Sequence, residues 1–521
     1  MKNGLFLLLN VVVINVCAQS PSYREVRLKE KATLLARSQK EAEAKSASQN
    51  FVRKYALLKE RVACGNCSAF VPQPGAIRSF DQQTMIIDTP GYYFFLEDVK
   101  WNPNHCPNNA AIVIQADNVT LDLNGYSLIA LGADSNRQFT GIKVSAANHV
   151  TIKNGTVSGM TYNGITTEAS SILTIDMLTI SAMNYSDTAA GAMPAGIRIS
   201  HADSFIVRNS KVVGMNVTSA SCVGVWIDDF SSRGHLYNDT VAHLRNNDGG
   251  VQGFSCFLSS GIRFNQCHSF DFQSHYVGRT NTEGHSVLGF MPVGCVDLSY
   301  DSCSAVGMVG CCDDAHGMSL FFDAGVEVNH FIARNITDGV TSTHTGAKAT
   351  GIEVYGAGIL IQNCLVDSIS AIVPQDLQCA GFSACGYGIK FENCTAKNVS
   401  VLNAQLIPDT TKGFGTGFGW APDPRDTLRN LTADTVVYSN CTAVNCQLGF
   451  DSWNHTNSVW NNWQALNCGR SVSQQSQTAT RTLSMNKCSE APNGIPFSTT
   501  ITNKAVNNRF DPPLLSKRTK K

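Results

Sequence analysis

The stretch from residue 111 to residue 125 reads AIVIQADNVTLDLNG, and it decides the fold. It contains two short runs in which apolar residues alternate with other residues, joined by Ala-Asp-Asn and closed by Asn-Gly. An alternation of period two is typical of a β-strand with one buried face, and Asn-Gly marks a tight bend. The layout recurs at 141–154, 196–209 and 351–363, with an asparagine 12 or 13 residues after a glycine. The stretch is therefore one unit of a repeat.

Each unit opens with a small residue followed by an apolar, a variable and an apolar residue. Eleven copies occur, spaced roughly 23 to 37 residues apart except for a last interval about twice as long. They begin at Ala111, Gly141, Gly164, Gly196, Gly224, Gly261, Gly289, Gly317, Gly351, Gly388 and Gly449. A period of this length, made of short strands without crossover helices, predicts an all-β solenoid in which successive units stack as parallel sheets.

The composition sets limits on the partners. The chain has 521 residues, 43% of them hydrophobic, with 40 acidic and 40 basic side chains. A net charge near zero gives no argument for a nucleic-acid partner. No motif for a cofactor is present; a calcium ion would be compatible with such a chain but has no motif here.

The two ends of the chain differ from the repeats. Residues 1–18 combine an early lysine, an apolar run and small residues before a break after Ala18, which predicts a secretory signal peptide. No later apolar run approaches the ~18 residues that cross a bilayer. We expect a secreted protein (extracellular, periplasmic or at a cell surface) with a helical or partly ordered N-terminal arm (19–62), a cap with the first rung (63–109), the solenoid (110–470), and a C-terminal cap with a disordered basic tail (471–521).

Cysteines are numerous. Removal of the signal peptide leaves 18 of the 19, and export predicts disulfide bonds. Six of them end strand-like runs and could instead be buried thiols stacked between rungs. These are Cys303, Cys364, Cys394, Cys441, Cys446 and Cys468.

The chain resembles a known family. Pro90-Gly91-Tyr92, Asp98, the unit at 111–125 and the following Gly-Ile-x-Val/Ile units are similar to right-handed parallel β-helix proteins of the pectin-lyase-like type, over roughly residues 85–470. The resemblance implies the fold. It does not imply one activity, because the family includes polysaccharide lyases, polygalacturonases, epimerases, tailspikes, adhesins and proteins without chemistry.

The third residue of each opening phrase is expected to point outward and to stack into a column. Lys143 to Arg263 would then span roughly 20 Å, with Trp226 between Arg198 and Arg263 and beside Asp228. Arginine pairs with carboxylates and an aromatic ring stacks on sugar faces, so this face could bind an acidic polysaccharide. An ordinary solvated sheet is the alternative. The candidate binding residues are Arg198, Trp226, Asp228, Arg263 and Lys390.

A second group could carry acid–base chemistry. Asp313, Asp314 and His316 precede one opening phrase, and Tyr355 follows in the outward column of the next unit, close to Lys348. Abstraction of a proton next to a uronate carboxyl needs a base, a neutralising group and often a phenol. Asp-Ala-His resembles the Asp-Pro-His of alginate epimerases, although Ala315 replaces the proline. The alternative is a turn in which the aspartates cap backbone amides.

Three hypotheses about the function follow from these groups of residues. Asp228-Asp229 with Gly234-His235 resembles the acidic residues and the Gly-His of polygalacturonases. The Asn-Thr-Asp and Arg-Ile-Lys segments of that family are missing here, so glycoside hydrolysis is the weaker hypothesis. The main hypothesis is a polysaccharide lyase or C5-epimerase with Asp313, Asp314, His316 and Tyr355 as catalytic residues. Its alternative is a non-catalytic surface or adhesin-type protein that binds glycans or acts as a spacer.

Overall fold

The fold is known from a computed structural model, and only part of the chain can be described in it. The described residues are 69–78, 80, 83–103, 109–186, 193–218, 220–275, 286–311, 314–339, 348–372, 378–403, 406–408, 415–419, 433–451, 455–456, 458–473, 483–486 and 489–490. The expected signal peptide, the expected N-terminal arm and the end of the basic tail lie outside these ranges.

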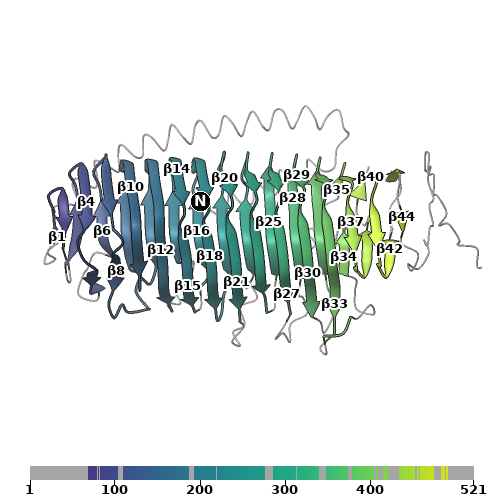
Figure 1. The fold of residues 1–521 in the computed structure, drawn as a ribbon, viewed down its shortest axis with the longest axis horizontal. Helices are drawn as coiled ribbons and strands as arrows, with labels where there is room; N and C mark the ends of the chain where they lie inside the picture. Colours follow the sequence, from purple (N-terminus) through teal and green to yellow (C-terminus); the bar gives the residue numbers. More distant parts are fainter. Residues whose placement is uncertain are drawn as a thin grey trace, which may run out of the picture.

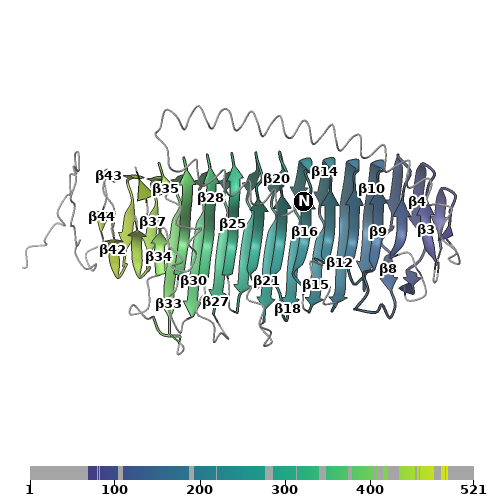
Figure 2. The same ribbon diagram turned by 180° about the vertical axis from the view of Figure 1, so that it is seen from behind.

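The described chain is a parallel β-helix, elongated along one axis, with strands that lie side by side from one end to the other (Figures 1 and 2). Each turn, or rung, contributes a strand to each of three sheets. All pairings between these strands are parallel, as the repeat and the family resemblance predicted. Within the described ranges no residue is in an α-helix, and Pro103 alone is in a 3-10 turn.

Sheet 1 consists of the following strands: β1 (Ala69–Phe70), β3 (Thr84–Ile87), β6 (Ala110–Ile114), β9 (Thr140–Ser145), β11 (Asn163–Glu168), β13 (Ala195–Ser200), β16 (Cys222–Asp228), β19 (Val251–Phe257), β22 (Val287–Val293), β25 (Asp314–Ala324), β28 (Lys348–Ala357), β31 (Gln378–Tyr387), β34 (Gly415–Phe418), β38 (Leu448–Asp451) and β42 (Arg470–Ser473), with the short β35 (Ala433–Asp434) and β39 (His455–Thr456) beside the end of β31.

Sheet 2 consists of β2 (Gly75–Ile77), β4 (Gly91–Phe95), β7 (Val119–Asp122), the first parts of β10 (Asn148–Ser158) and β12 (Ser171–Tyr185), β14 (Asp203–Arg208), β17 (Ser232–Tyr237), β20 (Arg263–Asn265), β23 (Ser299–Asp301), β26 (Glu327–Asn329), β29 (Leu360–Gln362), β32 (Lys390–Glu392), β36 (Val437–Ser439), β40 (Ser458–Asn461) and β43 (Leu483–Asn486).

Sheet 3 consists of β5 (Val99–Trp101), β8 (Ser127–Ala130), the second parts of β10 and β12, β15 (Lys211–Val217), β18 (Thr240–Asn246), β21 (His268–Ser274), β24 (Ser304–Val309), β27 (Ile332–Asp338), β30 (Leu365–Ile372), β33 (Thr395–Leu402), β37 (Thr442–Val444), β41 (Gln464–Leu466) and β44 (Ser489–Glu490).

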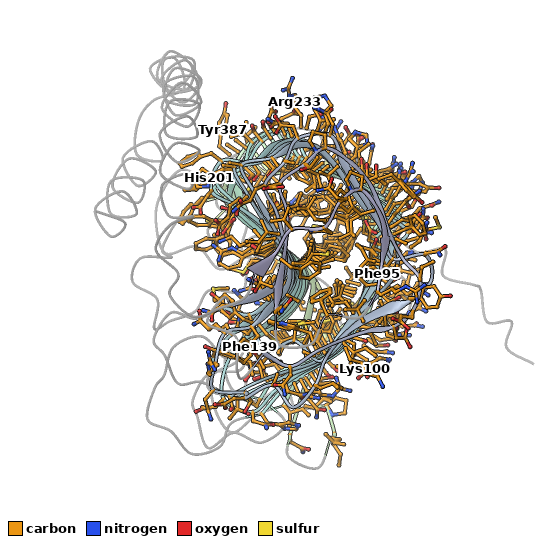
Figure 3. All side chains as sticks on the ribbon, turned by 90° about the vertical axis from the view of Figure 1, so that its left-hand side faces the viewer. Phe95, Lys100, Phe139, His201, Arg233 and Tyr387 are labelled. Carbon is orange, nitrogen blue, oxygen red and sulfur yellow. The ribbon has the colours of Figure 1, made fainter. Side chains whose placement is uncertain are left out.

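One continuous apolar core fills the space between the three sheets. Viewed along the axis, Phe95 and Phe139 lie toward the interior, whereas Lys100 and Arg233 point away from it (Figure 3). Equivalent positions stack on one another from rung to rung. The rings of Phe382, Phe418 and Phe450, for example, are stacked 4.8 and 4.9 Å apart. Such columns explain why the repeat keeps similar residues at each inward position.

A column of glycines runs along sheet 1 from β9 to β38, one in each rung. A Cβ on Gly164 would lie 2.7 Å from the carbonyl oxygen of Gly196 and 2.3 Å from the side chain of Ile180. The clash with the carbonyl oxygen of the next glycine, at 2.4–2.8 Å, recurs along the column. The backbones therefore approach so closely that no side chain fits between them. The column is Gly141, Gly164, Gly196, Gly224, Gly253, Gly289, Gly317, Gly351, Gly381, Gly417 and Gly449.

The corner after sheet 2 is a column of residues in the left-handed conformation. The asparagines predicted to bend the chain there have φ values of 58° (Asn154), 53° (Asn209) and 55° (Asn363), so that prediction is confirmed. Their amides also connect the rungs. Asn393 Nδ2 donates to Asn363 Oδ1 at 3.1 Å, and Asn440 Nδ2 donates to Asn393 Oδ1 at 3.0 Å.

The register corrects two of the predicted opening phrases. Gly261 and Gly388 do not belong to the glycine column, because their phrases form β20 and β32 of sheet 2. Both have a φ of 64° and are corner glycines. The missed members of sheet 1 are Gly253 and Gly381, while Gly417 divides the long last interval. The sequence pattern could not separate the two sets, because strands of both sheets alternate in the same way after a glycine.

The cysteines of the described ranges are buried thiols. All thirteen are buried and no disulfide bond joins two of them, which confirms the prediction for the six that end strand-like runs and does not confirm the disulfides expected from export. Several thiols donate to the carbonyl two residues earlier, as Cys364 Sγ does to Gln362 O at 3.1 Å. The other five cysteines of the expected mature chain lie outside the described residues; they are Cys64, Cys67, Cys106, Cys312 and Cys488.

The glycine column predicts a steric cost at a single site. Gly164→Ala should lower the thermal midpoint or prevent folding, since overpacking costs about 1–3 kcal/mol and here the obstacle is backbone. Thr166→Ala in the same strand is the control, because it leaves the spacing of the rungs unchanged. Equal thermal midpoints for the two variants in circular dichroism would contradict the packing account.

The thiols are predicted to be unreactive in the folded protein. Burial raises the pKa of both Cys222 and Cys379 to about 12, and alkylation requires the thiolate. Iodoacetamide at about pH 8 should label these two residues only after denaturant is added, as read by peptide mass spectrometry. Labelling of either residue in the native protein would show that the interior is open.

Candidate active site

The candidate site lies on the outer face of sheet 1, where β25 and β28 pair. In a regular strand Lys348 and Glu353, five residues apart, would face opposite sides. Gly351 changes this alternation, because a Cβ on it would point at the core side chain of Val366, at 2.3 Å, while the next residue, Ile352, is also in the core. Two consecutive inward positions bring Lys348 and Glu353 to the same outer face, where they are in contact.

The same change of alternation at Gly317 places Asp314 and His316 on this face. The register pairs Asp314 with Lys348, and Ser319 with Glu353. His316 Nδ1 lies 3.3 Å from Glu353 Oε2, and His316 Nε2 lies 3.8 Å from Asp314 Oδ2. Lysine, glutamate, histidine and aspartate therefore form a line of ionisable groups, which we call the acid–base line.

The environment of Glu353 favours its ionised form. Burial alone would raise its pKa, but the Lys348 ammonium and His316 outweigh burial and Asp314, so the pKa lies below the ordinary value. Ser319 Oγ also donates to Glu353 Oε2 at 3.2 Å. The backbone of Lys348 is held by Asp338, whose Oδ2 accepts the Lys348 N–H at 2.8 Å. Burial raises the pKa of Asp338 well above its ordinary value.

Exposure distinguishes the two ends of the acid–base line. The His316 ring is 1% exposed, whereas the Asp314 side chain is 22% exposed. Lys348 and Glu353 are buried as well. Only the Asp314 end is open to solvent, so a ligand that reaches the line meets Asp314 first.

The predicted catalytic residues are partly brought together. Asp314 and His316 are adjacent, and Tyr355 lies on the same face, but it is buried against Phe321, with ring centroids 5.4 Å apart. The Lys348 ammonium lies 5.7 Å from the centroid of the Tyr355 ring. Asp313 lies outside the described residues. Glu353 was not among the predicted catalytic residues, although it stands in the predicted outward column, where a carboxylate near a lysine was the available signal.

Three of the five predicted binding residues form a second cluster on sheet 1. Arg198 Nε and Nη2 both donate to Asp228 Oδ2, at 3.2 and 2.8 Å. The guanidinium carbon lies 4.2 Å from the centroid of the Trp226 ring. The pKa of Asp228 is raised, because burial outweighs the opposing effect of Arg198. In the register, Trp226 is flanked by Arg198 and Ser255, and not by Arg263 as predicted.

The other two predicted binding residues lie elsewhere. Arg263 is on sheet 2 and bonds Asp297 Oδ1 at 3.1 Å, and Lys390 is on sheet 2 beside Glu392. His235 also belongs to sheet 2, whereas Asp228 ends a strand of sheet 1. The expected single binding face is therefore divided, and Asp228 and His235 do not share a sheet face as a hydrolase pair would.

No group of three or more His, Cys, Asp or Glu side chains in the described residues is arranged to hold a metal ion. In the same ranges no helix has the length and apolar character to cross a membrane.

Comparison of the chain with known proteins finds distant similarity to solved structures. No family model matches it, and no curated protein matches it. Similar solved structures include tailspike protein 3 of bacteriophage CBA120 (10% identity, TM-score 0.37, covering 79% of this chain and 57% of the tailspike). Others are the catalytic domain of a GH87 α-1,3-glucanase (11%, 0.42, 77% and 64%) and the A-module of a mannuronan C-5 epimerase from Azotobacter vinelandii (10%, 0.40, 77% and 91%). At these values the class of the protein, a parallel β-helix, rests on its own strand pairing.

The acid–base line predicts a dependence of stability on pH. Because the pKa of Glu353 is lowered on folding, its ionised form stabilises the protein above the unfolded value of about 4.3, and this contribution is lost as the pH falls through the folded value. Glu353→Gln should be less stable at pH 7 by roughly 3–5 kcal/mol, since it leaves Lys348 buried without its partner. The difference in thermal midpoint should shrink toward pH 3.

The matched control is Glu327→Gln, which changes an exposed glutamate on sheet 2. Its thermal midpoint should follow that of the wild-type protein at every pH. A pH-independent difference between Glu353→Gln and wild type would contradict the assigned ionisation.

Proposed function

We propose that the protein is a secreted β-helix enzyme that acts on an acidic polysaccharide by proton abstraction, as lyases and C5-epimerases do. One observation carries the proposal: the outer face of sheet 1 holds a carboxylate–imidazole–carboxylate line whose one open end is Asp314. Clusters of ionisable groups with perturbed pKa values are typical of catalytic sites.

Each residue of the line has a role in this proposal. Asp314, the exposed end, takes the proton from C5 of a uronate. His316, on the buried side of Asp314, stabilises the proton transfer. Glu353 orients the imidazole, as the buried carboxylate does in hydrolase triads. Lys348 keeps Glu353 ionised. The carbanion then either expels the C4 oxygen, which leaves with a proton from water, or takes a proton from water on its opposite face, and Asp314 releases its proton to solvent.

Tyr355 is given a positioning role in this proposal. The sequence suggested it as the acid, but its ring is buried between Phe321 and the Lys348 side chain. It fixes the lysine that pairs with Glu353.

A second candidate is a non-catalytic glycan-binding protein. It is favoured by the burial of His316, Lys348 and Glu353, because a buried line of ionisable groups can serve the fold alone. In that case the outer face of sheet 1 binds a polysaccharide without changing it.

The experiment that separates the two candidates measures turnover on a panel of uronate polymers. We expect unsaturated-uronate absorbance, or exchange of the C5 hydrogen in deuterium oxide, on at least one polymer. Asp314→Asn should lower the rate about 100-fold or more, the loss expected for a positioned acid–base group, with an unchanged thermal midpoint.

The control variant is Asp297→Asn, which removes an exposed carboxylate just before β23 of sheet 2, away from the acid–base line, and should keep full activity. If wild-type protein yields neither product nor exchange on any polymer, catalysis is excluded and the binding candidate remains. If Asp314→Asn retains wild-type activity, the acid–base line is not the active site.

A further inference from the structure

We propose that Arg198 and Trp226 form a platform that binds the ring face of a pyranose, neutral or acidic, and does not select for a carboxylate. This second subsite adds to the proposed function, and its chemistry is the recognition of a sugar ring. It rests on the proposed function only in the kind of polymer that is bound. The platform consists of Arg198 and Trp226, with Asp228 beneath them.

The stack is built on adjacent rungs. Arg198 on β13 and Trp226 on β16 are register partners in the outward column of sheet 1. The guanidinium covers one side of the indole at 4.2 Å, and both its Nε and Nη2 are fixed by Asp228. A tryptophan held in this way keeps one orientation, so little conformational entropy is lost when a ligand stacks on it.

The charge of Arg198 is already compensated. Asp228 is buried and accepts two hydrogen bonds from the side-on edge of the guanidinium through one oxygen, so a carboxylate already lies beside the positive charge of Arg198. The two charged neighbours along the face, Lys143 and Glu168, also pair with each other at 3.2 Å. The platform is therefore not an anion clamp.

Donors suited to hydroxyl groups remain. Among the described residues, neither Arg198 Nη1 nor the indole Nε1 of Trp226 has a hydrogen-bond partner, and both side chains are half-buried. On the side away from Arg198, the register partner of Trp226 is Ser255, a small side chain. An aromatic face beside a small residue, with two outward donors, matches the apolar face and the hydroxyl groups of a sugar ring.

The platform and the acid–base line lie on one face. β16 is separated from β25 by three steps between paired strands, through β19 and β22. At about 4.8 Å per step this is roughly 14 Å along the axis. The column of Trp226 continues on β25 at Ser319, five residues after Asp314, so the two sites are also offset along the strands and an oligosaccharide of several sugars would be needed to bridge them.

The test uses matched pairs of oligosaccharides, each an uronate oligomer and its carboxyl-reduced counterpart, with binding followed by tryptophan fluorescence and calorimetry. We expect at least one pair to bind with affinities within about threefold of each other, changing less than about threefold between 0.05 and 0.5 M salt. Trp226→Ala should weaken both members of the pair about tenfold or more, and Trp226→Phe should weaken them less.

The matched control is Tyr237→Ala, which removes an exposed aromatic from sheet 2 and should leave binding unchanged. Thermal midpoints show whether each variant folds. The proposal is overturned if no pair binds, if Trp226→Ala binds like wild type, or if only the acidic member binds and salt abolishes it. Binding is measured without turnover, so the result of this test holds even if the protein has no catalytic activity.

Discussion

The close approach of backbones along the glycine column of sheet 1 is the constraint on which the rest of the structure depends. A Cβ at each glycine of the column from Gly141 to Gly417 would meet a carbonyl oxygen of the next rung at 2.4–2.8 Å. The column therefore fixes both the spacing and the register of the rungs. The same register holds for every other column, namely the core aromatic rings, the corner asparagines and the outward side chains.

The same glycines decide which side chains reach the outer face. Each one adds an inward position to its strand and so reverses the alternation on its two sides. Lys348 before Gly351 and Glu353 after it thereby meet on one face, and Asp314 and His316 before Gly317 join them. A structural requirement for space thus assembles a line of ionisable groups that simple alternation would have separated.

The two clusters on sheet 1 differ in how they hold charge. In the acid–base line the ionised groups are buried and perturb one another, and only Asp314 reaches solvent. In the Arg198–Trp226 platform the charge is compensated from beneath, and the outward surface is an aromatic ring with hydrogen-bond donors. The first arrangement suits proton transfer and the second suits contact with sugar rings.

The repeat by itself determined the parallel β-helix, the asparagine corners and the stacked thiols, because these follow from local periodicity and residue type. It also located Asp314, His316, Arg198 and Trp226 near their partners. Tertiary structure alone decided that Arg263 and Lys390 belong to sheet 2 and that Glu353 completes the line. The physical reason is that the sequence contains two kinds of glycine, those at corners and those that make space between backbones. Both kinds precede strands with the same alternating pattern, and only the stacking of the rungs shows which glycine is of which kind.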